Sequence, residues 1–168
     1  GKQTDAEVRK EYGVYGDQKL NVYLNDMGHN LAGLSHRPNL SYKLEVVDAS
    51  VVNAFAVPGG YLYLTRGILA YLNSEAELAG VMGHELGHIT ARHSAEQYSR
   101  AQLAQFGLVV GGLFLGDLGS GLAELGVGML FLSFSRDNER QADALGVEYA
   151  SKAGYDGKEL ASGGSDYT

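Results

Sequence analysis

Cysteine is absent from the 168 residues of this sequence, and basic side chains are outnumbered by acidic ones. Without cysteine there are no disulfide bonds, thiolate metal sites or cysteine nucleophiles, so any metal ion must be held by histidine, aspartate or glutamate. The 13 lysines and arginines against 20 aspartates and glutamates give a net charge of −7. This charge argues against nucleic acid or anionic lipid as the main partner.

A long hydrophobic run is also missing. A membrane-spanning helix needs about 20 mainly apolar residues. The glycine-rich segment 106–132 offers an uncharged apolar run of 11 residues, 106–116, before Asp117 interrupts it. We expect two short helices or a glycine-rich excursion near the functional site, with docking on lipid as the alternative and without a membrane span. No signal peptide is visible at the start of the sequence.

Apolar periodicity divides the chain into helices and short strands. Helical spacing predicts helices within 4–35, at 67–72, from Ser74 onward, at 96–105 and at 136–153. Alternating or β-branched runs predict strands at 42–48, 51–57 and 61–65, the last two joined as a hairpin by a turn at 58–60. We therefore expect one α+β domain over 1–161, mainly helical with a small three-stranded sheet, and a tail or linker at 162–168.

The most informative motif is the pentapeptide His84-Glu85-Leu86-Gly87-His88. A capping box at 74–77 precedes it, and apolar residues recur at helical spacing, so the motif lies on a helix. His84 and His88 then lie about 40° apart around the axis and can bind one zinc ion. Glu85, about 100° from His84, can reach a metal-bound water without being a ligand. The alternative is a helix with two ordinary histidines that match the motif by chance.

A catalytic zinc ion takes three protein ligands, so a third is needed. The candidates are His93, the other histidines and the downstream carboxylates. On a continuing helix His93 would lie about 140° from His88, so we expect it to cap the helix end or to pair with an acid. That leaves Glu139 as the ligand, with Asp143 on the same helix face to accept the free ring N–H of a ligand histidine. The alternative for both carboxylates is a solvated acidic face.

Three blocks, residues 53–60, 84–93 and 135–143, together resemble the gluzincin zinc metallopeptidases. That family includes the CAAX prenyl endoprotease, the heat-shock protease HtpX and bacterial periplasmic peptidases of outer-membrane quality control. The resemblance covers most of residues 40–155. It implies a zincin-like domain with one Zn²⁺ per chain, held by the two histidines of the motif and the downstream glutamate.

The same resemblance implies that Glu85 is the catalytic base. It also implies that a strand borders the active-site cleft and contacts the substrate, either the strand at Asn53, Ala54 and Phe55 or the strand at 61–65. The membrane members of the family have clear spanning helices, and many periplasmic members continue into tetratricopeptide repeats. Because this sequence has neither, we expect a soluble periplasmic or lipoprotein-type member, represented by its catalytic core.

The expected activity is zinc-dependent endopeptidase cleavage of extended or unfolded proteins in bacterial envelope quality control. Its partners are then protein or peptide substrates, in the periplasm or associated with the envelope. One alternative is a catalytically silent zinc-binding module that acts as a chaperone. Another is a peptidase that docks on lipid through 106–132. The oligomeric state and the natural substrate stay open.

Overall fold

The computed structural model describes residues 2–93, 95–96, 99 and 134–155. Its elements follow in the order α1 (Lys2–Tyr12), α2 (Gln18–Gly33), β1 (Lys43–Val47), β2 (Ala54–Val57), β3 (Tyr61–Thr65), α3 (Arg66–Tyr71), α4 (Glu75–Thr90) and α7 (Arg136–Lys152). Helices with one small sheet confirm the predicted α+β class. The predicted domain boundary at residue 161 and the tail at 162–168 lie outside the described residues and stay predictions.

The three described strands form one sheet in the order β1-β3-β2. β2 and β3 pair antiparallel across the turn at 58–60, which confirms the predicted hairpin. β1 pairs with β3 in parallel, with Leu44 opposite Leu62. The sequence did not predict this pairing, because β1 and β3 are not neighbours along the chain. β2 therefore lies at the end of the strand order.

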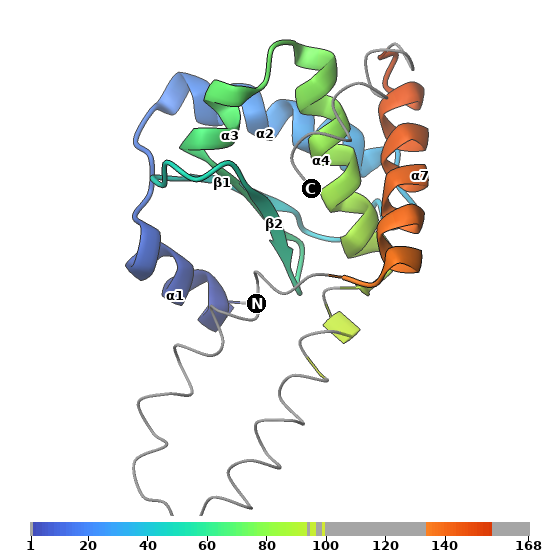
Figure 1. Ribbon diagram of the computed structural model, residues 1–168, viewed down its shortest axis with the longest axis horizontal. Helices are drawn as coiled ribbons and strands as arrows, with labels where there is room; N and C mark the ends of the chain where they lie inside the picture. The colour runs from blue at the N-terminus through green and yellow to red at the C-terminus, as the bar shows by residue number, and fades with distance from the viewer. Residues whose placement is uncertain (1, 94, 97–98, 100–133, 156–168) are drawn as a thin grey trace, which may run out of the picture.

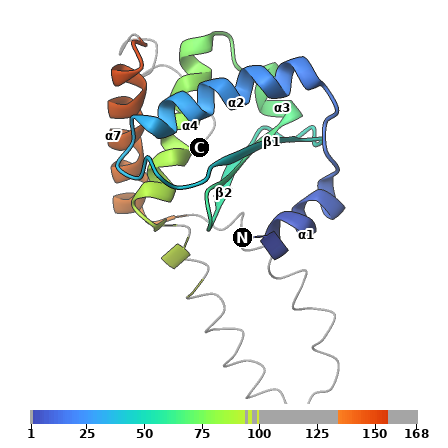
Figure 2. The same ribbon diagram turned by 180° about the vertical axis from the view of Figure 1, so that it is seen from behind.

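Both faces of the sheet are covered. Successive side chains of a strand point to opposite faces. In β3, Leu62 and Leu64 belong to the core shared with α2, α4 and α7, whereas Tyr61 and Tyr63 belong to a second cluster with Val8 of α1. Figures 1 and 2 show α1 apart from the group formed by α2, α4 and α7. Burial on both faces explains why β2 and β3 are buried at every position.

Helices α4 and α7 pack side by side with their backbones in close approach (Figure 1). A Cβ added to Gly83 would lie 2.7 Å from the carbonyl oxygen of Gly146. A Cβ added to Gly146 would lie 2.6 Å from the amide nitrogen of His84. A Cβ added to Gly87 would lie 2.9 Å from the carbonyl oxygen of Ala142. Small residues at these positions let α7 lie directly against the helix that carries the two motif histidines.

Serine caps begin both of these helices. The Oγ of Ser74 accepts a hydrogen bond from the Glu77 amide at 3.1 Å, and the Glu77 carboxylate accepts one from the amide of Asn73 at 2.7 Å. Ser135 accepts a hydrogen bond from the Asn138 amide at 3.1 Å, which fixes the start of α7. These side chains satisfy amide groups that have no partner within the helix.

Helix α4 ends at Thr90 and does not continue to His93. Its C-cap is Ala91, and Arg92 adopts a φ of 62°, which turns the chain out of the helix. Residues 95, 96 and 99 are helical, while the other residues of the predicted helix at 96–105 and the whole of 106–132 lie outside the described residues. Within the described part of the chain, no helix is both long and apolar enough to cross a membrane.

Candidate metal centre

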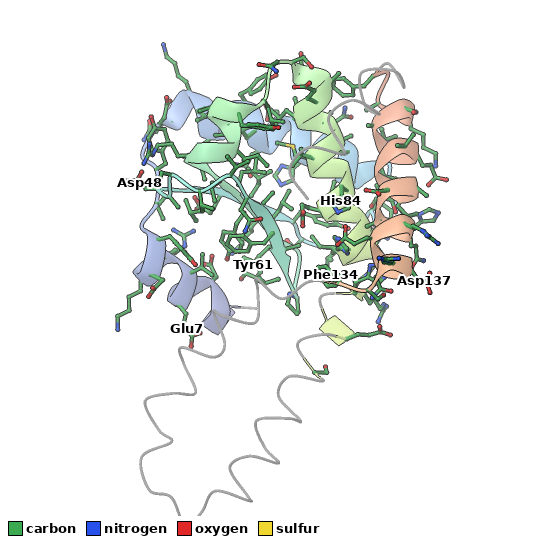
Figure 3. All side chains as sticks on the ribbon, in the orientation of Figure 1. Glu7, Asp48, Tyr61, His84, Phe134 and Asp137 are labelled. Carbon is green, nitrogen blue, oxygen red and sulfur yellow. The ribbon has the colours of Figure 1, made fainter. Side chains whose placement is uncertain are left out.

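The side chains of His84, His88 and Glu139 converge between α4 and α7. Figure 3 labels His84 on α4, and its ring contacts carboxylates of the neighbouring α7. The Nε2 atoms of the two histidines lie 3.1 Å apart. Glu139 reaches both rings, with one carboxylate oxygen 3.1 Å from Nε2 of His84 and the other 3.2 Å from Nε2 of His88. The α4–α7 contact thus joins a histidine pair to a glutamate some 50 residues further along the chain.

These three side chains fit a metal ion. Ligand atoms about 2.0–2.1 Å from a tetrahedral zinc ion lie about 3.3 Å from one another. The three observed separations, 3.1, 3.1 and 3.2 Å, are close to that value. Among the described residues, His84, His88 and Glu139 form a group whose ligand atoms all lie within 4.8 Å of one another. The set of two imidazoles and one carboxylate is also one that zinc accepts.

Burial and nearby charges shift the pKa values of all three side chains of the centre. His84 is 7% exposed and His88 1%. Burial opposes protonation of His84, but the hydrogen bond to Glu139 and the charges of nearby carboxylates outweigh it and raise its pKa to about 9. For His88 burial prevails and lowers the pKa. Hydrogen bonds from the two rings hold the pKa of Glu139 well below its usual range. The carboxylate is therefore charged and ready to accept a cation.

Glu85 is buried beside this centre, with 5% of its surface exposed. Burial raises the pKa of its carboxyl group to about 8, against the opposing effect of His84. A cation bound at the three neighbouring side chains would add positive charge and lower this pKa. A carboxyl group that titrates near neutral pH is suited to accept and return a proton.

Asp143 lies on the outer side of His84. Its carboxylate oxygen is 2.6 Å from Nδ1, whereas Nε2 of the same ring faces Glu139. Asp143 and Glu139 are one turn apart on α7, so a single helix face supplies both carboxylates. An acceptor at Nδ1 places the ring proton there and leaves Nε2 free for a metal ion.

His93 occupies a position that the sequence analysis did not predict. It was expected at the helix end as a cap or an ion-pair partner. Instead it is 3% exposed, with its Nδ1 atom 3.0 Å from Nδ1 of His88. Its Nε2 atom lies 2.8 Å from the side-chain oxygen of Gln141 on α7. The expectation failed because it assumed a continuing helix, whereas the turn at Arg92 brings His93 back beside His88.

Phe134 is a second residue that the sequence analysis missed. Its ring stacks on the ring of His88, with centroids 4.0 Å apart and an interplanar angle of 21°. Figure 3 labels Phe134 just before α7, near the base of α4. Stacking shields the imidazole from water and limits its rotation. In the sequence, the one signal for this contact with His88 is that Phe134 directly precedes Ser135, the N-cap of the helix that carries Glu139.

Residues Asn53, Ala54 and Phe55, the predicted substrate contacts, lie at the start of β2 or just before it. The side-chain oxygen of Asn53 accepts a hydrogen bond from the Ala54 amide at 2.9 Å. Ala54 belongs to the core cluster that includes α4. The Phe55 ring instead stacks on Tyr63 in the cluster on the α1 side, with centroids 5.0 Å apart. β2 packs against α4, so this segment lies next to the helix that carries the motif.

A helix with two histidines one turn apart, completed by a glutamate from a second helix, is the arrangement of an HExxH metallopeptidase site. The family model for Peptidase family M48 matches residues 18–163. The chain belongs to this family.

Curated relatives support the assignment. The chain is 32% identical to a putative beta-barrel assembly-enhancing protease of Vibrio cholerae, over 89% of this chain and 33% of that protein. It is 36% identical to the mitochondrial metalloendopeptidase OMA1 of Arabidopsis thaliana, over 91% of this chain and 31% of that protein. A relative of the same name from Schizosaccharomyces pombe is 35% identical over 89% of this chain and 45% of its own length. The chain thus spans less than half of each of these relatives.

Proposed function

We propose that this chain is the catalytic domain of a zinc metalloendopeptidase. The observation that carries the proposal is the convergence of His84, His88 and Glu139, with mutual distances of 3.1–3.2 Å, beside the buried carboxyl group of Glu85. Membership of Peptidase family M48 supports zinc as the metal. One ion per chain is expected, because the three side chains form one compact group.

The proposed mechanism assigns a separate task to each neighbouring side chain. When bound, zinc supplies Lewis-acid polarisation of the scissile carbonyl group and makes water more acidic. Glu85 accepts a proton from the attacking water and delivers it to the nitrogen of the leaving amine. Asp143 holds the His84 ring with its proton on Nδ1. The carboxylate of Glu139 offsets positive charge that would otherwise be buried between the helices.

The proposed substrate is an extended segment of protein that lies along β2. β2 lies at the end of the described strand order, and it packs against the motif helix. A peptide added there as a further strand would be recognised mainly through its backbone. Ala54 and Phe55 would contribute main-chain groups, since the Phe55 ring is engaged with Tyr63. Asn53, which directly precedes β2, would contact the substrate at the start of that strand. Recognition of backbone favours unfolded proteins over a defined sequence.

The proposed setting is protein quality control in the bacterial periplasm or at the envelope. The support is the similarity to proteins named as beta-barrel assembly-enhancing proteases. The finer placement with the gluzincins of the CAAX prenyl endoprotease and HtpX rests on the three sequence blocks at 53–60, 84–93 and 135–143. We also propose that the domain extends over 1–161 and ends in a linker at 162–168.

Replacing Glu85 with glutamine tests the mechanism directly. Cleavage of an unfolded protein such as β-casein and the zinc content of the same sample are measured together. We expect Glu85→Gln to keep one zinc ion per chain and to lose at least 100-fold in kcat/KM, within the range for a general base. Glu11→Gln, the same change at an exposed position of α1, should behave as the wild type.

The possible results separate the alternatives. Undiminished cleavage at full zinc content would remove Glu85 from the mechanism. A wild-type protein that binds zinc but cleaves no unfolded substrate would favour the silent chaperone-like module. A wild-type protein that binds no zinc would overturn the metal site itself.

A further inference from the structure

The two motif histidines, His84 and His88, have different partners at Nδ1, the ring nitrogen that faces away from the candidate metal site. Nδ1 of His84 faces the carboxylate of Asp143 at 2.6 Å. Nδ1 of His88 faces a second imidazole, that of His93, at 3.0 Å. His93 in turn faces the side-chain oxygen of Gln141 at 2.8 Å through its other nitrogen. One ligand histidine is thus backed by a carboxylate, and the other by an imidazole that is itself backed by an amide oxygen.

The geometry permits one consistent set of protons when His88 binds a metal ion. The Nε2 atom of His88 faces His84 and Glu139, so a metal there requires the ring proton on Nδ1. That N–H must donate to Nδ1 of His93, which therefore carries no proton. The proton of His93 then lies on Nε2 and donates to the oxygen of Gln141. With one proton on each ring, any other arrangement places two N–H groups or two lone pairs opposite each other.

The backbone is held in a disfavoured conformation to make this contact. Arg92 has a φ of 62°, a left-handed conformation that is disfavoured for a residue with a side chain. The turn redirects the chain so that His93, five residues after His88, packs edge-on against the His88 ring with centroids 5.2 Å apart. His93 is 3% exposed there. Strain retained beside a candidate site is consistent with a functional constraint.

We propose that His93 and Gln141 act as positioning residues that fix the tautomer and orientation of His88 for zinc binding. The proposal rests on the proposed zinc site of His84, His88 and Glu139. The Gln141 oxygen sets the tautomer of His93, and His93 then sets that of His88. Partners of this kind contribute about 10- to 100-fold to metal affinity when they back a ligand directly.

The test uses Gln141 because it is exposed on α7, so substitutions there should leave the fold intact. Gln141→Glu keeps an oxygen acceptor for His93. Gln141→Lys offers only donors, which drives the His93 proton to Nδ1, opposite the N–H of His88. Ala144→Glu and Ala144→Lys introduce the same side chains at another exposed position of α7 and serve as matched controls.

The zinc dissociation constant of each variant is measured by competition with a chelator. We expect Gln141→Lys to bind zinc about tenfold more weakly than Ala144→Lys, and Gln141→Glu to bind at least as tightly as Ala144→Glu. Equal constants within each matched pair would overturn the proposal while leaving the metal site in place. A wild-type protein that binds no zinc would instead overturn the proposed metal site, and with it the positioning role of His93 and Gln141.

A second measurement reads the tautomer itself. In zinc-loaded protein labelled with ¹⁵N-histidine, the spectrum of His93 should show its proton on Nε2. In Gln141→Lys the proton should move to Nδ1 or exchange between the two nitrogens. A proton on Nδ1 of His93 in the wild-type protein would overturn the proposal.

Discussion

Asp143 contacts Nδ1 of His84 at 2.6 Å, while Glu139, one turn earlier on the same helix, lies 3.1 Å from Nε2 of the same ring. Two carboxylates on one face of α7 therefore contact both ring nitrogens of His84. The side chain of Asp143 is 59% exposed and that of His84 8%. The carboxylate thus reaches a buried ring from the surface, and it can be changed without opening the core.

Removing this carboxylate should weaken zinc binding. We expect Asp143→Ala to raise the zinc dissociation constant by about 10- to 100-fold, because the His84 ring loses the acceptor that fixes its tautomer. Asp143→Asn should have a smaller effect, since its amide oxygen can still accept the N–H. Competition with a chelator measures both constants, and circular dichroism checks that α7 stays folded. Glu148→Ala, at an exposed carboxylate on the same helix, is the control. An unchanged constant for Asp143→Ala would rule out this role.

Local patterns were sufficient to predict the helices that form the centre. The Ser74 cap, the helical spacing of apolar residues after it and the pentapeptide at 84–88 together predicted a helix with two histidines on one face, and α4 has this form. The predicted helix at 136–153 also matches α7 to within one residue, and Gly154, which has a φ of 95°, directly follows its C-cap Ala153. These features depend on residues within a few positions of one another.

The features that were missed depend on contacts between distant segments. No local pattern distinguishes the parallel pairing of β1 with β3 from other arrangements of three short strands. The place of His93 depends on a left-handed conformation at Arg92, which an arginine gives no reason to expect. Phe134 stacks on His88 only because α7 packs against α4. Each of these follows from tertiary packing, which overrides local preference.

A buried tyrosine on the far side of the sheet gives a prediction about alkaline pH. The hydroxyl of Tyr63 on β3 donates a hydrogen bond to Asp5 of α1. Burial, and then this bond to a carboxylate, raise the pKa of Tyr63 far above the ordinary value of about 10. Below pH 10 both folded and unfolded chains keep the proton, and the full contribution to stability is present. Above pH 10 only the unfolded chain loses it, so stability falls as pH rises.

We expect Tyr63→Phe to reduce this dependence. Ionisation of Tyr63 in the unfolded chain alone contributes up to about 1.4 kcal/mol per pH unit above pH 10. The free energy of unfolding in urea, measured from pH 8 to pH 11, should fall less steeply for the variant by up to that amount. At pH 8 the variant should be less stable by about 1–3 kcal/mol, because a hydrogen bond to a charged group is lost. An equal slope for variant and wild type would contradict the prediction.

The close contact of α4 and α7 gives the last prediction. In Gly146→Ala the new Cβ would lie 2.6 Å from the His84 amide nitrogen and 2.9 Å from the carbonyl carbon of Gly83. Both are backbone atoms, so the helices must move apart, which we expect to lower the free energy of unfolding by about 1–3 kcal/mol. His84 and Glu139 then separate, and the zinc dissociation constant should rise. Gly33→Ala in α2, where no atom lies within 4 Å of the added Cβ, should leave zinc binding unchanged and raise stability by up to about 1 kcal/mol. If both variants keep wild-type affinity for zinc, the backbone contact at Gly146 does not set the distance between the ligands.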